Sequence, residues 1–327
     1  MFLSIFIAFG TVASWLLLLV MIPLLRRQLL DKPNSRSSHL QPIPRGGGVV
    51  FVFLSIVFSI LGLFKDSIFI FSIIPLLALP LAIVGLCDDR YNLPALWRYG
   101  VQCVTAILML SVSSLVHQFV LANLSGVFFL LPVLLALVIA FTSIINFTNF
   151  MDGLDGLVAG CMSVSIATLS FSLNAPFALW ILVGSLFGFL LWNWSPARVF
   201  MGDVGSTFLG AVFAGLVLQA SSWSESFGYL LIATPLLADA FFCVLRRLLA
   251  GHRVFQPHRL HLFQRLHQAG WSHARVSLSY ISATVILALA MLLGGLTWVF
   301  SLAFIEFLIG IWLDQCFAVP FLMASKS

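Results

Sequence analysis

The chain has 327 residues, of which 61% are hydrophobic and only 8% charged, with a formal net charge of +5. Because a soluble domain of this length carries about 25% charged residues, the composition excludes a soluble fold. Repeated apolar runs of about 20 residues are each long enough to cross a hydrocarbon core of about 30 Å. They lack strand-like alternation, and backbone groups in lipid must bond internally, so the runs indicate helices. We expect an all-α polytopic membrane protein with a single integral membrane domain over residues 1–327.

In chain order, the apolar runs predict a bundle of about eleven membrane spans. They cover residues 3–25, 48–64, 68–87, 99–117, 127–146, 157–173, 177–194, 205–221, 228–248, 276–293 and 296–313. The first run has no basic segment before it and no small-residue cleavage site, so we expect a retained span rather than a signal peptide. The weakest break, Gly294-Gly295, separates the last two spans. The five cysteines show no paired spacing, so neither a disulfide framework nor a zinc site is predicted.

The basic residues fall almost entirely on one side of this arrangement. Of the 16 Lys and Arg residues, all but Lys65 lie in or beside the odd-numbered connections and the C-terminal tail. The positive-inside rule therefore places these connections and the C-terminus in the cytoplasm and the N-terminus outside. Six of the seven histidines, all but His117, lie in the same connections together with several aspartates. We therefore expect an active site on the cytoplasmic face.

Asp88 and Asp89 end the third predicted span. Adjacent carboxylates repel each other, and each raises the pKa of its neighbour. A cation relieves this repulsion, and oxygen ligands suit Mg²⁺, which also recruits substrate phosphates. The alternative is a solvated acidic pair at a helix end, with Arg90 as its partner.

Asn149, Asp152 and Asp155 recur at intervals of three in the segment that runs from Asn146 to Leu157, so they lie near one face if the segment is helical. Two glycines in the segment allow a close backbone approach or a left-handed turn. Acids at a membrane boundary without basic partners indicate a ligand. The alternative is that Asp155 only caps the following span.

Asp203 opens the eighth predicted span and is flanked by Gly202 and Gly205. Exposed backbone N–H groups at a helix N-terminus favour phosphate binding. The alternative is a capping aspartate with no other role.

Two basic loops complete the set of candidates. In the loop 31–48, Arg36, His39 and Arg45 all precede a glycine triplet, and Arg45 is directly beside it. These residues are expected to bind phosphates, and the alternative is that they anchor the loop to anionic lipid head groups. In the loop 249–275, the segment from His258 to His261 has helical spacing typical of an interfacial helix. Two histidines at i and i+3 suit zinc, but the sequence shows no third ligand nearby. We therefore expect phosphate and sugar contacts, with membrane anchoring as the alternative.

Asp239 and Glu306 are acids within predicted spans. Each costs about 2.5–3.5 kcal/mol on insertion scales unless compensated. Asp239 follows Pro235 by four residues, so we expect it to face the bundle and bond a kinked backbone. The sequence assigns no role to Glu306.

These motifs together resemble the polyprenyl-phosphate N-acetylhexosamine-1-phosphate transferases, also called glycosyltransferase family 4, over nearly the whole chain. The segments that carry the resemblance, in the order of the family, are the Pro-Arg-Gly-Gly-Gly run at Arg45, Asp88-Asp89, the Asn146–Leu157 block, Met201–Ser206 and His258–Arg265. The run His258-Arg259-Leu260-His261 is closer to WecA- and WbpL-type members than to MraY-type members, which have three consecutive histidines. A phospho-MurNAc-pentapeptide transferase of peptidoglycan synthesis is therefore the less favoured alternative.

The resemblance implies a Mg²⁺-dependent enzyme, with Mn²⁺ as an alternative ion, in the bacterial cytoplasmic (inner) membrane. It implies transfer of a sugar-1-phosphate from a UDP-N-acetylhexosamine to undecaprenyl phosphate, with release of UMP, at the start of O-antigen-like lipopolysaccharide synthesis. It implies Asn149 and Asp203 as metal ligands, Asp88, Asp89 and Asp152 as catalytic acids, Asp155 and Asn146 at the nucleotide, and Arg45, His258, Arg259 and His261 at the phosphates and sugar. The position of Asp152 is not acidic in every member, so its role stays open.

Other possibilities concern the chemistry and the partners. We expect a single direct displacement, with a covalent phospho-aspartate as the alternative. A lipid or ion transporter is the rival from another class, but transporters hold their sites near the membrane midplane, whereas these acids gather at one face. The expected partners are the sugar nucleotide, undecaprenyl phosphate and membrane lipids, without nucleic acid, and a homodimer is one assembly open to the chain.

Overall fold

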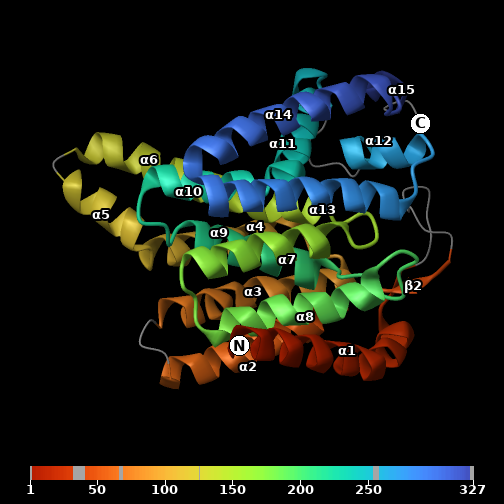
Figure 1. Ribbon diagram of the computed structural model, residues 1–327, viewed down its shortest axis with the longest axis horizontal. Helices are drawn as coiled ribbons and strands as arrows, with labels where there is room; N and C mark the ends of the chain where they lie inside the picture. Colours follow the sequence, from red (N-terminus) through yellow and green to blue (C-terminus); the bar gives the residue numbers. More distant parts are fainter. Residues whose placement is uncertain (1, 32–40, 66–68, 125, 253–257, 325–327) are drawn as a thin grey trace.

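The computed structural model describes residues 2–31, 41–65, 69–124, 126–252 and 258–324. These residues form an α-helical bundle and a two-stranded sheet (Figure 1). The elements are α1 (Phe2–Gln28), β1 (Leu30–Asp31), β2 (Ile43–Pro44), α2 (Gly48–Lys65), α3 (Ile70–Tyr91), α4 (Ala95–Ser111), α5 (Ser114–Ala122), α6 (Val127–Phe150), α7 (Leu157–Ser172), α8 (Phe177–Asn193), α9 (Asp203–Val217), α10 (Trp223–Ile232), α11 (Thr234–Leu249), α12 (Leu262–Gln268), α13 (His273–Leu289), the π-helical turn η1 (Ala290–Gly294), α14 (Gly295–Cys316) and α15 (Phe321–Ala324).

The helices identify a multi-pass membrane protein, as the composition predicts. Within the described ranges, five helical runs are long and apolar enough to cross a membrane, and seven are if each bent helix pair counts as one span. Three further apolar helices, α7, α8 and α9, are shorter. Large apolar side chains remain exposed on the outer helices, for example Phe128 of α6 at 98%, which suits contact with lipid. The all-α polytopic class is confirmed, and the number of eleven crossings stays a prediction.

Two predicted continuous spans are wrong in detail, because each is a bent pair of helices. The span predicted over 99–117 breaks between α4 and α5, which meet at 74°, and the hydroxyl of Ser113 accepts the N–H of Val116 to start the second helix. The span predicted over 228–248 breaks between α10 and α11, which meet at 86°. Pro235 lies in the first turn of α11, where its missing N–H is not needed.

The predicted break at Gly294-Gly295 is present. Gly295 has a φ of +70°, a conformation that favours glycine. Figure 1 shows α13 and α14 meeting there and both extending back toward the side of the molecule that carries α12 and β2.

Helix α9 lies at the centre of the bundle, and every residue from Val204 to Val217 is buried. It packs against α2, α3, α6 and α7, which surround it with apolar side chains. Only its N-terminus, at Asp203, reaches the side of the bundle where the polar residues gather. The position of α9 therefore fixes where its first residue meets the ends of its neighbours.

The sheet and its connection hold the loop that contains Arg45 beside the start of α9. β1 and β2 pair antiparallel, with Leu30 opposite Pro44. The N–H of Phe200 donates to the carbonyl of Pro44 (2.8 Å), and the N–H of Gly47 donates to the carbonyl of Phe200 (2.9 Å). These bonds bring the segment before α2 against the segment before α9.

Candidate active site

Polar residues predicted from three separate motifs meet at one end of the bundle. Asp88 and Asp89 lie in the last turns of α3, Asn149 lies at the end of α6, and Asp203 is the first residue of α9. A Cβ on Gly85 of α3 would lie 2.6 Å from the backbone of Asp203, so only glycine permits this close approach of α9 to α3. A small cavity of about 50 Å³ opens beside Asn149 and Asp203.

Asp89 is the fixed carboxylate of the group, with a fully buried side chain. Its Oδ1 atom accepts from Nε of Arg45 at 2.9 Å, and a second guanidinium nitrogen binds the same atom. The N–H of Asp203 also donates to this oxygen, at 3.2 Å. Asp89 therefore joins the loop before α2 to the start of α9, and its predicted catalytic role stays a prediction.

Asp88 and Asp203 share one counter-ion, Arg98, which the sequence interpretation missed. Nη1 of Arg98 lies 2.7 Å from Oδ2 of Asp88 and 3.8 Å from Oδ2 of Asp203. The N–H of Leu93 donates to the other oxygen of Asp88 at 2.6 Å. Two carboxylates around one half-exposed guanidinium form a cluster in which a divalent ion can replace the arginine as counter-charge.

Asn149 and Asn146 lie on the same side of α6 and both line the small cavity. Nδ2 of Asn149 donates to the hydroxyl of Ser206 at 2.9 Å, which joins the end of α6 to the first turn of α9. Asn146 forms a paired amide contact with Gln102 of α4, at 2.8 and 3.2 Å. A signal for Arg98 and Gln102 does exist in the sequence, because they are four residues apart in an otherwise apolar helix and therefore share one face.

Asp152 lies in the turn between α6 and α7. Burial raises its pKa to about 7, and the negative charges of Asp203 and Asp89 act in the same direction. The structure therefore places Asp152 within the electrostatic reach of the acid cluster. A carboxyl group with this pKa changes charge near neutral pH.

Asp155 lies at a different contact, between the α6–α7 turn and α13. Its Oδ2 atom accepts from the N–H of Ala197 at 3.2 Å and lies 3.1 Å from Nδ1 of His273. Burial raises the pKa of Asp155, but the bonds from His273 and Ala197 outweigh it and hold this pKa below its ordinary value. The cap position of α7 is Gly156, so the simple capping role is wrong, and the predicted nucleotide contact stays a prediction.

The segment from His258 to His261 is held by Asp239. Its two carboxylate oxygens accept the N–H groups of Leu262 (2.7 Å) and Phe263 (3.0 Å), and the hydroxyl of Tyr280 donates to it at 2.8 Å. We expected Asp239 to bond the kinked backbone of its own helix, and this expectation is wrong. Its carboxylate instead caps the N-terminus of α12.

The two histidines of this segment differ in exposure. His261 is only 2% exposed, so a substrate contact through it needs an opening of the loop. His258 is half-buried, and its pKa is lowered to about 3 by burial and by the charges of His261 and Arg247. It is therefore neutral near pH 7 and acts there as a hydrogen-bonding group rather than a cation. The backbone carbonyl of Arg259 accepts from Gln268 (3.0 Å). Arg36 and His39 lie outside the described residues.

Arg265, in the last of the recognised motifs, has a structural position. It is 2% exposed and binds the carboxylate of Asp314, which Arg246 of α11 also binds at 2.7 Å. Nη1 of Arg265 donates to the carbonyl of Val319 at 2.8 Å. These contacts tie the end of α14 to α11 and α12.

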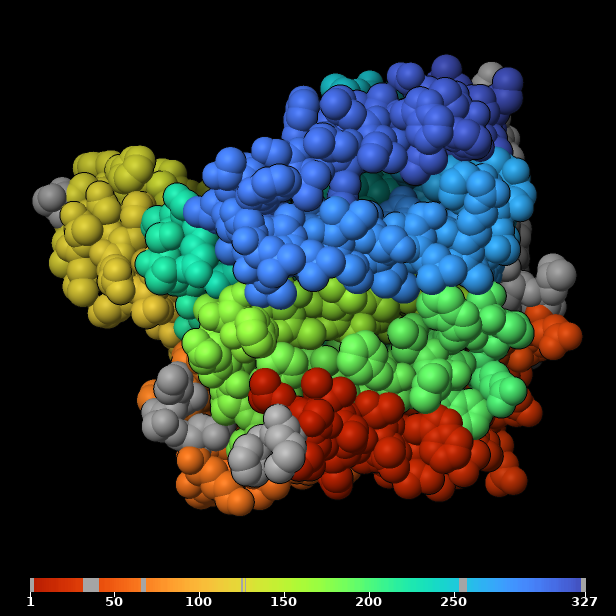
Figure 2. All heavy atoms as spheres, in the orientation of Figure 1, coloured from red at the N-terminus to blue at the C-terminus, as the bar shows by residue number. Residues whose placement is uncertain are grey.

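A larger, mostly apolar cavity of about 600 Å³ lies between α11, α13 and α14. Figure 2 shows it as a hollow between the two blue helices, with the teal of α11 at its base. It is separate from the small cavity at Asp203, and its lining includes Asp239, Tyr280 and Glu306. The carboxylate oxygens of Glu306 have no hydrogen-bond partner among the described residues.

Comparison with known proteins agrees with this arrangement of motifs. Residues 70–221, which include Asp88, Asp89, Asn149 and Asp203, match the model of glycosyl transferase family 4. The chain is 32% identical over 278 residues to the undecaprenyl-phosphate alpha-N-acetylglucosaminyl 1-phosphate transferase of Salmonella typhi, covering 80% of this chain and 75% of the relative. The chain belongs to glycosyl transferase family 4.

Two further relatives of this family 4 protein are also named as polyprenyl-phosphate N-acetylglucosamine phosphotransferases. The decaprenyl-phosphate N-acetylglucosaminephosphotransferase of Mycobacterium leprae is 31% identical, over 77% of this chain and 73% of its own length. A probable undecaprenyl-phosphate N-acetylglucosaminyl 1-phosphate transferase of Bacillus subtilis is 28% identical, over 80% of this chain and 77% of its own length. The predicted family of polyprenyl-phosphate N-acetylhexosamine-1-phosphate transferases is therefore confirmed.

Proposed function

We propose that this family 4 chain transfers N-acetylglucosamine-1-phosphate, or a closely related N-acetylhexosamine-1-phosphate, from a UDP-sugar to undecaprenyl phosphate. The lipid phosphate attacks the β-phosphorus of the nucleotide sugar, and UMP leaves in a single displacement. The names of the relatives support the polyprenyl-phosphate acceptor and the N-acetylglucosamine-type donor. The observation that carries the proposal is the meeting of three helix ends: Asp88 and Asp203 share Arg98, and Asn149 and Asp203 line the same small cavity.

The donor set fits Mg²⁺, with Mn²⁺ as the alternative. Asp203 and Asn149 offer a carboxylate and an amide oxygen beside a small cavity that leaves room for water, and oxygen ligands with retained waters are the surroundings that Mg²⁺ prefers. The excess of carboxylates around Arg98 also needs positive charge. When bound, the ion supplies charge that offsets the repulsion between the two phosphate-bearing substrates.

We assign the three acids Asp88, Asp89 and Asp152 different roles in the reaction. Asp88 faces the reacting phosphates and holds or accepts the proton of the lipid phosphate, since its exposure is slightly greater than that of Asp89. Asp89 keeps Arg45 and the start of α9 in place. Asp152 adjusts the charge of the cluster near neutral pH.

The remaining predicted residues surround the donor. Asp155 contacts the nucleotide from the α6–α7 turn, and Asn146 supports the cavity that it shares with Asn149. Arg45 and Arg259 offer positive charge to the phosphates, while His258 and His261 serve as hydrogen-bonding groups for the phosphate and sugar. The side chain of His261 is buried beside Asp239, so a contact between His261 and the substrate requires movement of the segment before α12.

The membrane supplies the acceptor. The apolar cavity between α11, α13 and α14 offers surface for an isoprenoid chain. The basic residues support a site on the cytoplasmic face of the bacterial inner membrane, where sugar nucleotides are made. We further propose a role in starting O-antigen-like lipopolysaccharide synthesis, with peptidoglycan synthesis as the less favoured alternative.

The test is release of UMP by the purified protein in detergent with undecaprenyl phosphate, Mg²⁺ and a panel of UDP-sugars. We expect UDP-N-acetylglucosamine or a close analogue to give turnover that chelation abolishes. Asp203→Asn should lower kcat by on the order of 100-fold or more, because it removes charge at the reacting phosphates. Glu225→Gln is the matched control, since Glu225 is an acid that bonds Ser221 and Tyr229 at the start of α10.

Two results would contradict the proposal. Full turnover by Asp203→Asn would show that the acid cluster takes no part in the reaction. A radiolabelled phospho-enzyme trapped without lipid acceptor would replace the single displacement with a covalent phospho-aspartate.

A further inference from the structure

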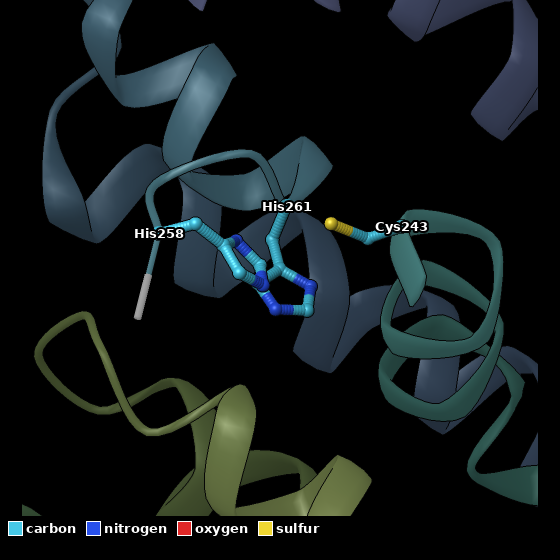
Figure 3. Close-up of side chains that lie close together, drawn as sticks. All are labelled: Cys243, His258 and His261. Carbon is cyan, nitrogen blue, oxygen red and sulfur yellow. The ribbon is translucent and has the colours of Figure 1, made fainter. Parts of the chain in front are cut away.

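Cys243 of α11 and the histidines at 258 and 261 bring three metal-binding atoms together. One sulfur and one ring nitrogen from each histidine lie within 4.8 Å of one another. Figure 3 shows the thiol of Cys243 pointing from α11 toward the two imidazole rings. The ring centroids of the histidines are 5.0 Å apart, with an angle of 29° between the planes. Along the sequence no third ligand lies near the two histidines, and the fold brings Cys243 to them from another helix.

Two of the three residues are buried, His258 is half-buried, and the cluster has an unsatisfied polar atom. Cys243 is 4% exposed and His261 is 2% exposed. Nδ1 of His261 is buried and has no hydrogen-bond partner among the described residues. It lies 3.7 Å from the carboxylate of Asp239, slightly too far for a hydrogen bond. Buried imidazoles at metal sites place their second ring N–H against a carboxylate in this way.

We propose that Cys243, His258 and His261 form a binding site for one thiophilic divalent cation of the Zn²⁺ class. A thiolate and two imidazoles suit Zn²⁺, whereas Mg²⁺ takes oxygen ligands. Three protein ligands leave a fourth position for water or a substrate oxygen. This site is distinct in chemistry from the oxygen cluster at Asp203.

The geometry requires only a small closure. Zinc bonds of about 2.0–2.3 Å in a tetrahedron set the donor atoms about 3.3–3.6 Å apart. The three donor atoms now lie within 4.8 Å of one another, so they need to approach one another by about 1 Å to bind the ion. Nδ1 of His261 lies 3.7 Å from Asp239, so a shift of less than 1 Å toward the carboxylate is enough for a hydrogen bond.

Protons and charge balance in this site. Formation of the sulfur–metal bond breaks the S–H bond of Cys243 and releases its proton to solvent. The thiolate and the Asp239 carboxylate together offset the two charges of the ion. Nδ1 of His258 now accepts the N–H of Leu260 at 3.3 Å, a long contact that is lost if Nε2 binds the ion and the ring proton moves to Nδ1.

A bound ion would tie the segment before α12 to α11. Because His258 and His261 are also the proposed sugar and phosphate contacts, Zn²⁺ should oppose the Mg²⁺-dependent transfer. Only this consequence rests on the proposed function; the binding of the ion does not.

The test titrates Zn²⁺, and separately Co²⁺, into the purified full-length protein in detergent. We expect one Zn²⁺ per chain and, with Co²⁺, a thiolate-to-metal charge-transfer band. Cys243→Ser should abolish the band and weaken Zn²⁺ binding by more than the roughly 10–100-fold typical of losing an outer partner of a metal ligand. His258→Gln should weaken binding as well. Cys103→Ser is the control, because Cys103 is an exposed thiol of α4.

Size-exclusion profiles and metal-free thermal stability show that each variant is folded. An unchanged cobalt band or unchanged Zn²⁺ affinity in folded Cys243→Ser would overturn the site, as would the absence of binding by the wild-type chain. These readouts need no turnover, so they separate this inference from the proposed transferase reaction. Zn²⁺ binding without inhibition of UMP release would overturn only the proposed effect on transfer.

Discussion

Arg45 binds the buried carboxylate of Asp89 across 44 residues of sequence, at the point where α9 begins. Nε of Arg45 lies 2.9 Å from Oδ1 of Asp89, and the N–H of Asp203 donates to the same oxygen at 3.2 Å. One buried carboxylate thus holds the loop before α2 and the first residue of the central helix. A buried carboxylate without a partner is strongly unfavourable, so the position of Asp203 depends on Arg45.

Removal of Arg45 should therefore destabilise the protein as well as weaken transfer. Arg45→Ala leaves Asp89 as an unpaired buried charge, which costs about 3–5 kcal/mol. Arg45→Lys keeps the charge but lacks the planar fork, and should lose less. Thermal unfolding in detergent and UMP release measure the two effects.

The control for this prediction is Arg90→Ala. Arg90 lies in the last turn of α3 next to the same acids, but it is exposed and rests over the ring of Tyr91. We expect little change in the melting temperature of this variant. Equal losses in Arg45→Ala and Arg90→Ala would show that general surface charge, and not the Arg45–Asp89 pair, supports the site.

Gly85 makes the acid cluster possible by its lack of a side chain. A Cβ at this position would lie 2.6 Å from the backbone carbon and oxygen of Asp203, a distance that real Cβ atoms do not adopt. Gly85→Ala should push α9 away from α3, at a cost of about 1–3 kcal/mol or more, and should lower both Mg²⁺ affinity and UMP release.

Gly100→Ala is a matched control within a neighbouring helix. A Cβ on Gly100 meets nothing within 4 Å, and alanine is preferred to glycine in helices by about 0.5–1 kcal/mol. This variant should be as stable as the wild type or slightly more so. Normal activity in Gly85→Ala would mean that the α3–α9 contact does not position the reacting groups.

Sequence periodicity and hydropathy are sufficient to predict the class of this fold, because lipid exposure imposes long apolar helices. Hydropathy does not distinguish a straight span from a broken one, so it does not predict the bend at Ser113. Pro235 does indicate a kink in its span, but not that two separate helices meet there at 86°. α9 is only 15 residues long, and its buried position follows from packing against four other helices rather than from its own composition.

In the site, too, some residues can be predicted from the sequence, whereas others become apparent only from the packing of the helices. Asp88, Asn149 and Asp203 stand out as polar residues in apolar surroundings, so their motifs are visible along the chain. Their partners are harder to identify. The spacing of Arg98 and Gln102 marks one face of α4, but it does not show that Arg98 binds Asp88 and Asp203, and Ser206 becomes relevant only when α6 and α9 meet. The capping of α12 by Asp239 joins residues 23 and 24 positions apart, and no local spacing rule predicts it.

Asp239 should control the order of the segment before α12. Its carboxylate accepts the N–H groups of Leu262 and Phe263 and the hydroxyl of Tyr280. Asp239→Ala removes all three bonds, and loss of a helix cap alone costs about 0.5–2 kcal/mol. We expect faster amide hydrogen exchange in residues 258–268 and a higher KM for the sugar nucleotide.

Tyr280→Phe tests how specific this effect is. It removes one donor to Asp239 but leaves the two backbone bonds, so the exchange of α12 should change much less than in Asp239→Ala. Unchanged exchange in Asp239→Ala would show that packing of Phe263 and Leu266, both buried, holds α12 without the cap.

Asp152 should make binding of the proposed Mg²⁺ depend on pH. Burial raises its pKa to about 7, and repulsion from Asp203 and Asp89 adds to the shift, so the carboxyl is neutral below that pH and charged above it. A divalent ion near Asp203 favours the charged form, and binding therefore releases a proton near neutral pH. Mg²⁺ affinity should rise as the pH increases from about 6 to about 8.

Calorimetric titration of Mg²⁺ at several pH values, in buffers with different ionisation enthalpies, measures this proton release. Burial also raises the pKa of Asp203 to about 7, so this acid titrates over the same range. Asp152→Asn should therefore keep part of the pH dependence and release fewer protons on binding Mg²⁺ than the wild type does. The variant should match the wild type most closely at low pH, where Asp152 is already neutral. A pH slope in Asp152→Asn as steep as that of the wild type would assign the titration to another acid of the cluster, because the remaining carboxylates would then account for the whole of the released proton.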